Sequence, residues 1–223
     1  MQDMLTELYS HRVIRRRFSY ERFLDTLLEN RVPYEKRNVA KQTILVSERE
    51  PDPSVFFIEK GTVSLEREDQ IIAFLGANQI AGLSNTFIID ESLYTFRAQE
   101  KCSLYVFPRG AVVELLLSMQ EGWIYLYMNH LNHDGMLVDK CLIMREPSEL
   151  RLKHCIRGLM RRFGTRREDV IELPKCFSKK VIANYANVST KTVAQTWKQW
   201  GEDGYIDADA NHFVCRSTEF LQL

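Results

Sequence analysis

The chain has 223 residues, enough for one large or two small domains, and 45% of them are hydrophobic, enough for a buried core. Thirty basic side chains balance thirty acidic ones, so the overall charge gives no argument for a polyanionic partner. The chain has neither an apolar N-terminal signal region nor a run near the roughly 18 apolar residues of a membrane span. We therefore expect a soluble, cytoplasmic protein with no membrane partner.

The first half of the chain has two kinds of sequence pattern, one helical and one strand-like. Residues 3–30 carry apolar side chains at helical spacing, which predicts one or two short helices. From about 36 to 108, short strand-like runs such as "QTILVS" and "CSLYVFP" alternate with turn residues, as in an antiparallel sandwich or roll. In "EKGTVSL", Gly61 follows a strand-like run and predicts a tight turn between two paired strands.

A long helix is predicted over residues 111–145. From residue 124 its apolar positions are spaced alternately by four and three, an a/d seam typical of a helix that packs along a partner helix. The seam consists of Ile124, Met128, Leu131, Gly135, Val138 and Leu142. We favour a parallel homodimer. The alternative is packing on the β-domain of the same chain, which Tyr125, Leu126 and Leu137, lying off the seam, can serve simultaneously.

The segment "REPSEL" (145–150) predicts a hinge. Pro147 disfavours helical geometry at Glu146, and Ser148 is placed to cap a new helix that runs to Gly164. A strand-like "VIELP" follows. Near the end, "GYIDADANHFVCR" predicts two short strands around an Asp/Asn turn.

The C-terminal third is strongly basic. Residues 150–200 contain twelve basic side chains and three acidic ones, a local excess of nine positive charges. A charge asymmetry of this kind indicates contact with nucleic acid or with a membrane surface.

Within this basic region, "FSKKVIANYANVSTKTVAQTWKQW" has the spacing of two helices that cross at a short turn. Ala183 is small enough for close approach, Asn187 tolerates left-handed geometry in the turn, and Val193 seals the second helix. Ser178 and Ser189 are placed to cap the two helices.

The second helix presents two different faces. Trp197 and Trp200 follow Val193 at helical spacing and are expected in the core, whereas Lys191, Gln195 and Lys198 repeat that spacing on the exposed face. Lysines in the first turn of the first helix oppose its dipole, and a bound phosphate would remove that conflict. The alternative is a solvated helix whose charges only confer solubility. We favour DNA binding, because the basic cluster, the helix-crossing spacing, the two serine caps and the two short strands after the second helix all indicate the same function.

The stretch "FSKKVIANYANVSTKTVAQTWKQWGEDGYI" resembles the Crp/Fnr family of bacterial transcription regulators without a gap, and "VFFIEKGTVSL" and "RAQEKCSLYVFPRGAV" resemble it more loosely. The resemblance covers nearly the whole chain. It implies an α+β fold with an N-terminal antiparallel β-roll of the cyclic-nucleotide-binding kind, a long dimerisation helix and a C-terminal winged helix-turn-helix. The corresponding domains are 1–110, 111–145 and 146–223.

The resemblance implies that the helix 190–200 enters the major groove of a palindromic operator, with half-sites about one helical turn apart. Thr190, Lys191 and Gln195 then face bases. Candidate phosphate contacts are Ser178, Lys179, Ser189, Thr192 and Lys198. Well-known members place Arg, Glu and a second Arg at 190, 191 and 195. The arginine–guanine fork is therefore missing here, although Gln195 suits adenine and Lys191 suits guanine or phosphate.

The effector side departs further from the family. Members that bind cyclic nucleotides carry Glu for the ribose and Arg for the phosphate, where this chain has Gly82 and Ser92. No cysteine precedes Cys102, so the N-terminal cluster that holds an iron–sulfur centre in some members is absent. We therefore expect no cofactor, neither cAMP nor an iron–sulfur cluster, and leave a different small-molecule effector open.

Further polar residues have two interpretations each. His130 and His133 are a weak metal-ligand pair, and we expect surface histidines and no metal. The scattered Cys102, Cys141, Cys155 and Cys176 can include a thiol switch or can be packing residues, which is the commoner case.

The leading hypothesis is a homodimeric DNA-binding regulator whose partners are double-stranded DNA, a second copy and RNA polymerase. One alternative is a sensory or scaffolding module whose winged helix contacts protein. Another is a cupin-like enzyme, which is disfavoured because residues 36–108 contain no histidine to ligate a metal. We accordingly assign no catalytic residues.

Overall fold

The computed structural model describes residues 10–83, 91–167, 170–207 and 212–216. The chain forms two compact units. The first contains Met1–Leu65 and Phe74–Gly135, and the second contains Glu66–Ala73 and Met136–Leu223. The three-part division at residues 110 and 145 stays a prediction. Within the described residues, no helix is long and apolar enough to cross a membrane.

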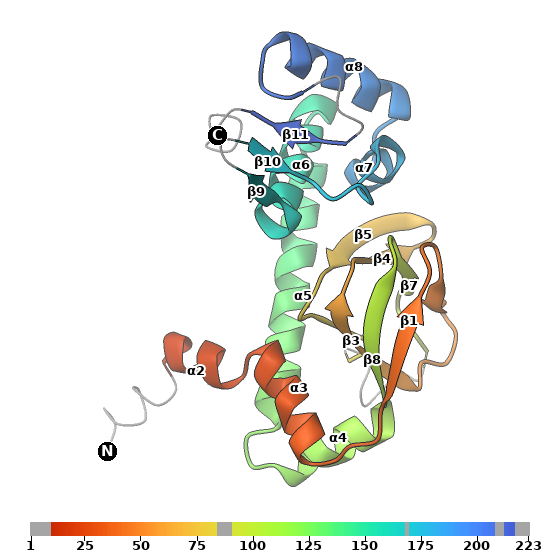
Figure 1. Ribbon diagram of the computed structural model, residues 1–223, viewed down its shortest axis with the longest axis vertical. Helices are drawn as coiled ribbons and strands as arrows, with labels where there is room; N and C mark the ends of the chain where they lie inside the picture. The colour runs from red at the N-terminus through yellow and green to blue at the C-terminus, as the bar shows by residue number, and fades with distance from the viewer. Residues whose placement is uncertain (1–9, 84–90, 168–169, 208–211, 217–223) are drawn as a thin grey trace. The chain divides into compact units, whose positions relative to one another are not determined.

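From residue 10 onward, two short helices precede the β-structure, as the spacing of apolar residues predicts: α2 (His11–Arg17) and α3 (Tyr20–Glu29) (Figure 1). Ser19 caps α3, because its hydroxyl accepts a hydrogen bond from the backbone N–H of Arg22 at 3.2 Å. The apolar side of α3 buries Phe23 and Leu27.

In the described residues of this region, eight strands form two four-stranded sheets. The sheet orders are β1-β8-β3-β6 and β2-β7-β4-β5. The pairings β1–β8, β3–β8, β3–β6 and β2–β7 are all antiparallel, which confirms the predicted antiparallel β-roll and the α+β class. The strands are β1 (Glu35–Val39), β2 (Ile44–Val46), β3 (Ser54–Lys60), β4 (Val63–Arg67), β5 (Gln70–Leu75), β6 (Ile80–Ala81), β7 (Thr95–Ala98) and β8 (Cys102–Pro108).

The turn at Gly61 is present, but the strands that it joins are not paired with each other. Its φ of +102° is left-handed, and a Cβ there would lie 2.6 Å from Sγ of Cys102, so glycine is required by both geometry and space. Strand β3 belongs to one sheet and β4 to the other. The predicted hairpin is therefore wrong, because the turn carries the chain from one sheet to the other.

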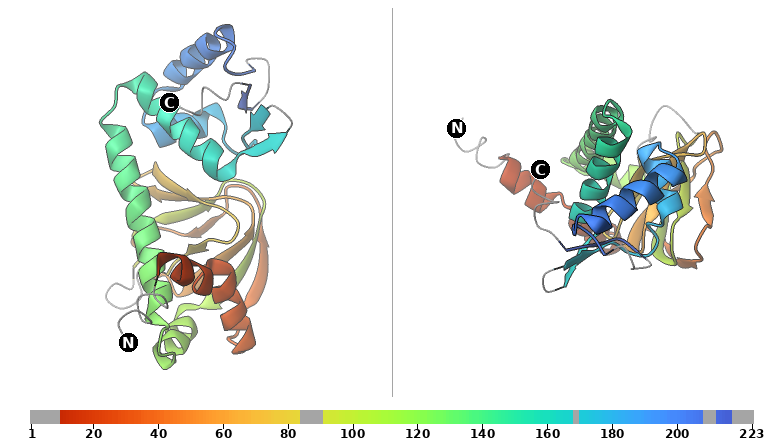
Figure 2. Two further views of the ribbon diagram at one scale, coloured as in Figure 1. Left: turned by 90° about the vertical axis from the view of Figure 1, so that its left-hand side faces the viewer. Right: turned by 90° about the horizontal axis from the view of Figure 1, so that it is seen from above.

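The single long helix predicted over 111–145 is two helices, α4 (Arg109–Ser118) and α5 (Trp123–Met144). The break lies at Gly122, whose backbone passes so close to Leu116 that a Cβ would lie 2.1 Å from the Leu116 carbonyl oxygen. The start of α5 packs into the core beside α3 (Figure 2). There Tyr125 stacks on Phe23 with ring centroids 4.4 Å apart.

The second unit continues with α6 (Ser148–Phe163), the strands β9 (Thr165–Arg167) and β10 (Val170–Glu172), α7 (Lys179–Ala186), α8 (Thr190–Glu202) and β11 (Val214–Cys215). The hinge before α6 is present, but the predicted cap is wrong. Pro147 occupies the N-cap position and no side chain caps the helix, so Ser148 is its first residue. Gly164 ends α6 as predicted.

A small antiparallel sheet, in the order β11-β10-β9, packs in this unit. The predicted strand "VIELP" is β10. The second predicted pair of strands flanks residues 208–211, which lie outside the described residues. On either side, Asp207 N–H donates to the Val214 carbonyl and Arg216 N–H to the Tyr205 carbonyl, both at 2.9 Å, so the chain returns antiparallel to itself.

Candidate nucleic-acid interface

The candidate interface is built on the turn between α7 and α8. Asn187 ends α7 in the left-handed region, with φ 51° and ψ 52°. Its N–H donates to the Asn184 carbonyl, and the N–H of Val188 donates to the Ala183 carbonyl, both at 3.0 Å. Asparagine tolerates this geometry better than most residues, which is why it serves here in place of glycine.

Serines cap both helices, as their positions predict. The hydroxyl of Ser178 accepts from the N–H of Val181 at 3.3 Å. The hydroxyl of Ser189 accepts from the N–H of Thr192 at 2.9 Å and lies 2.8 Å from the Thr192 hydroxyl. These bonds fix where each helix begins, and therefore which side chains stand in its first turn.

The apolar side of α8 is fully covered. Val193, Trp197 and Trp200 are buried, and the Trp197 ring meets the ring of Phe213 edge-on with centroids 4.8 Å apart. On α7, Ala183 is buried at the approach of the two helices. The predicted assignment of both tryptophans to the core is confirmed.

The opposite side of α8 is exposed and polar. Thr190, Lys191 and Gln195 are exposed, as is the small Ala194 between them. Lys198 is exposed too, but its ammonium lies 3.6 Å from the carboxylate of Glu202. The free cationic charge on this face is therefore concentrated near its N-terminal end, at Lys191.

The candidate phosphate contacts differ in their exposure to solvent. Ser178, Lys179 and Ser189 are exposed at the starts of the helices, whereas Thr192 is half-buried and its hydroxyl faces Ser189. The Lys179 ammonium lies 4.9 Å from the centroid of Trp197, a cation–π distance. The first turn of α7 holds no acidic side chain, so it presents backbone N–H groups and positive charge together.

Two residues that the sequence patterns do not single out support this helix pair. Arg151 on α6 donates from Nη2 to the Asn187 carbonyl in the turn at 3.0 Å. Lys140 on α5 donates to the Tyr185 carbonyl and lies 3.9 Å from that ring, and burial lowers the pKa of Lys140 to about 8. Burial also raises the pKa of Tyr185 to about 12. Their only signal in the sequence is positive charge, which does not distinguish a supporting lysine from an exposed one.

The predicted seam on α5 divides in the structure. Ile124 is buried in the chain's own core and Met128 is packed against it, so Ile124 does not belong to an exposed seam. From there on the seam is open: Leu131 is 44% exposed, Val138 57% and Leu142 56%. Gly135 is exposed between them.

The other polar residues of α5 and the cysteines lie as follows. His130 is exposed, as expected, with Nε2 3.5 Å from Oδ2 of Asp134. The expectation of a surface position is wrong for His133, which is buried, and burial lowers its pKa to about 4. No group of three metal-ligating side chains lies close together in the part of the chain that the structure describes.

Cys141 is exposed, and the remaining cysteines are buried: Cys102, Cys155, Cys176 and Cys215.

Gly82 and Ser92, which stand where the family resemblance implies Glu and Arg in cyclic-nucleotide binders, are both closely packed within the β-roll. Gly82 has φ +83°, and a Cβ there would lie 2.4 Å from the Ser54 carbonyl oxygen, so no larger side chain fits without a rearrangement. Ser92 is buried, and its hydroxyl donates to the Tyr94 carbonyl at 2.6 Å. The intervening residues 84–90 lie outside the described residues.

Comparison with known proteins agrees with this description. Residues 36–119 match the family model of the cyclic nucleotide-binding domain. No curated protein sequence matches the chain.

Solved structures of bacterial proteins share this fold over more than four fifths of the chain. FixK2 from Bradyrhizobium japonicum is 19% identical with a TM-score of 0.74, over 85% of this chain and 96% of its own. The c-di-GMP-responsive global regulator CLP from Xanthomonas campestris is 17% identical with a TM-score of 0.71, over 88% and 99%. A CRP/FNR-family transcriptional regulator from Thermus thermophilus, TTHA1359, is 14% identical with a TM-score of 0.68, over 84% and 96%. The resemblance to the Crp/Fnr family is thus confirmed in its domain and its fold.

Proposed function

We propose that the protein is a DNA-binding transcription regulator that recognises a palindromic operator as a homodimer. The observation that carries the proposal is the α7–α8 pair, whose apolar side is buried while Thr190, Lys191 and Gln195 stand exposed on one face. A helix held in this way has the form that enters a major groove. The fold shared with the global regulator CLP and the transcriptional regulator TTHA1359 supports the same conclusion.

Recognition divides between bases and backbone. The amide of Gln195 can bond adenine in a bidentate manner, and Lys191 can reach guanine or a phosphate. Ser178, Lys179 and Ser189, exposed near the helix N-termini, would position the protein on phosphates, with smaller contributions from Thr192, which is half-buried, and from Lys198, whose ammonium lies beside Glu202. The operator differs from that of members with an arginine fork.

The open part of the seam on α5 supports the dimer. Leu131, Val138 and Leu142 form an apolar strip on a single helix, with Gly135 allowing close backbone approach. A second copy of the same helix would cover this strip. The β-roll, with Gly82 and Ser92 at its two key positions, is a domain of the cyclic-nucleotide-binding kind that does not use cAMP. RNA polymerase is the further partner that we propose.

Selection of bound fragments from random duplex DNA tests the proposal. We expect enrichment of a palindrome with half-sites about one turn apart, and binding that weakens steeply with salt. Replacing Lys191 or Gln195 by Ala should weaken operator binding about tenfold and relax the preference at one position of each half-site. Lys41→Ala, an exposed lysine of the β-roll, is the control and should change neither.

Unchanged affinity and preference in both α8 variants would refute the assigned role of this helix. Absence of any enriched sequence, together with recovery of a stable protein partner, would instead favour the scaffolding alternative.

A further inference from the structure

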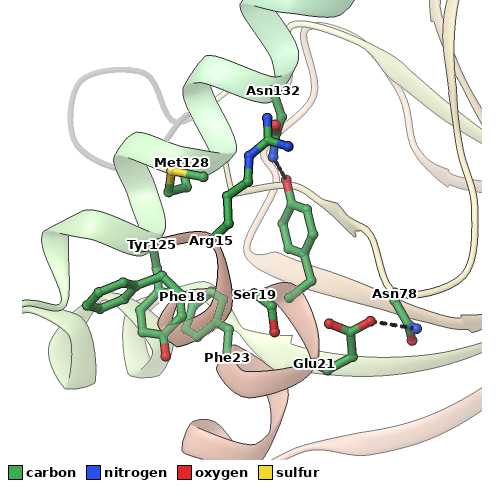
Figure 3. A pocket seen from close by; sticks show the side chains of 10 residues that line it. Arg15, Phe18, Ser19, Glu21, Phe23, Asn78, Tyr125, Met128 and Asn132 are labelled. Carbon is green, nitrogen blue, oxygen red and sulfur yellow. Dashed lines mark hydrogen bonds between the residues drawn. The ribbon is translucent and has the colours of Figure 1, made fainter. Parts of the chain in front are cut away.

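A cleft of about 280 Å³ lies in the first unit, between the N-terminal helices, the turn before β6 and the start of α5 (Figure 3). It is separate from the positions of Gly82 and Ser92, neither of which lines it. Its walls combine four aromatic rings with one cation and one carboxylate. Drug-sized ligands occupy pockets of about 300–1,000 Å³, so this volume suits a molecule with a single ring.

The floor of the cleft is aromatic and firmly packed. Tyr125 stacks on Phe23 and meets Phe18 edge-on, with ring centroids 5.1 Å apart in the second pair. All three side chains belong to the buried core, and Met128 on α5 adds a thioether beside them. A flat aromatic ligand gains from such a surface through ring–ring and sulfur–ring contacts, and the surface is already formed without it.

One end of the cleft attracts an anion. The Tyr20 hydroxyl accepts from the Asn132 side chain at 3.1 Å and lies 3.3 Å from the amide oxygen of the buried Asn129, which fixes these groups. Figure 3 shows the guanidinium of Arg15 extending toward Asn132. Among the described residues, no carboxylate pairs with Arg15, so its fork of donors is available to a ligand carboxylate.

The other charged group in the lining is negative and fixed. The carboxylate of Glu21 accepts from the Asn78 side chain at 3.0 Å, which ties the first turn of α3 to the turn before β6. That carboxylate favours a neutral or hydrogen-bond-donating group on the ligand and opposes a second negative charge. The cleft therefore selects one anionic group and not two.

We propose that this cleft binds a small aromatic monocarboxylate, whose carboxylate pairs with Arg15 and whose ring lies on the surface of Phe18, Phe23 and Tyr125. Because α5 also carries the open apolar strip, a ligand here sits against the element proposed for dimer contact. The site assignment itself does not depend on DNA binding.

Isothermal titration of the full chain with benzoate, phenylacetate and 3-phenylpropanoate tests the proposal in the absence of DNA. We expect saturable binding of at least one of these acids, and at least tenfold weaker binding of the matching neutral amide, which cannot form the charged pair. Arg15→Gln should weaken binding of the acid at least tenfold and leave binding of the amide unchanged. Arg16→Gln, which changes an exposed arginine of the same helix outside the cleft, is the matched control and should leave both unchanged.

The role of Glu21 is tested with a dicarboxylate of the same ring, such as 1,4-phenylenediacetate. The native protein should reject it, and Glu21→Gln, which keeps the acceptor for Asn78, should raise its affinity at least fivefold. Asp25→Asn, at an exposed carboxylate of the same helix outside the cleft, should not.

No binding of the three acids at 10 mM (on the order of the weakest specific affinities) would overturn the proposal, as would equal binding of acid and amide or an Arg15→Gln variant that binds normally. Circular dichroism of each variant establishes that it is folded. Each of these outcomes leaves operator selection untouched, so failure of this site and failure of the proposed function are distinguishable.

Discussion

The helices α5 and α8 are both amphipathic, and they expose opposite kinds of surface. On α8 the apolar side is covered by its own unit and the polar side faces outward, with Lys191 and Gln195 exposed. On α5 the start of the helix is covered by its own unit, but the apolar strip from Leu131 to Leu142 faces outward.

The difference is the basis for proposing a different partner for each helix. A polar, cationic surface on a helix is well solvated in water, and it can form favourable contacts with a phosphate backbone or with base edges. Exposing an apolar strip over several helical turns to water is unfavourable in free energy, and a partner surface that covers the strip removes this penalty. The same amphipathic pattern therefore predicts DNA as the partner of α8 and a second copy of the chain as the partner of α5. Variants of the two helices should accordingly lose different properties.

The largest expected effect on stability comes from a comparison of two tryptophans, one on the buried side of α8 and one exposed on α5. Trp197 is 3% exposed and Trp123 at the start of α5 is 58% exposed. Trp197→Ala leaves a large cavity beside Phe213 and should lower the free energy of unfolding of the second unit by about 3–5 kcal/mol. Urea denaturation followed by circular dichroism measures this loss.

Trp123→Ala is the matched control, since it removes the same side chain from an exposed position, and its effect should stay within about 0.5 kcal/mol. Equal losses in the two variants would contradict the assignment of Trp197 to the core of the second unit and of Trp123 to the surface.

The next effect concerns the apolar strip on α5. Val138→Glu places a charge in the middle of the proposed helix–helix contact, once from each copy. We expect the dissociation constant of the dimer to rise by a factor on the order of 30, because losing about 2 kcal/mol of apolar contact corresponds to that ratio. Sedimentation equilibrium measures the change.

His130→Glu introduces the same charge at an exposed position of α5 off the seam and should leave the dimer intact. A monomeric native protein, or a dimer that tolerates Val138→Glu, would show that this strip serves another partner.

The sequence predicts most reliably what local chemistry decides. The caps at Ser178 and Ser189 and the buried Trp197 follow from spacing alone, because each depends on residues within two turns of the same helix. The short strand-like runs separated by turn residues likewise predict the antiparallel roll.

What the sequence does not predict depends on distant partners. Gly61 marks a turn, but only the sheet order shows that the turn joins two different sheets. The repeat on α5 continues through Ile124 without a change in pattern, although this residue is buried by α3 and the β-roll. Likewise, nothing local distinguishes Arg15 at the cleft from Arg16 beside it.

The smallest expected effect tests the turn that sets the angle between α7 and α8. Asn187 has φ 51°, a left-handed conformation that glycine adopts without cost. Asn187→Gly should change stability by less than about 0.5 kcal/mol, since it relieves the backbone but increases the freedom of the unfolded chain. Asn187→Val should cost at least 1–2 kcal/mol, roughly the penalty of a side chain in left-handed geometry made worse by β-branching.

Thermal unfolding measures both variants, and operator binding then separates the turn from the face that it positions. The carbonyl of residue 187 still receives the Arg151 guanidinium in either variant, so the support from α6 is unchanged. We expect Asn187→Gly to bind the operator with native affinity, because Lys191 and Gln195 keep their places on α8. A glycine variant that is stable yet reads a different sequence would mean that the asparagine side chain itself takes part in recognition, and the comparison between the two helices would then have to include the turn.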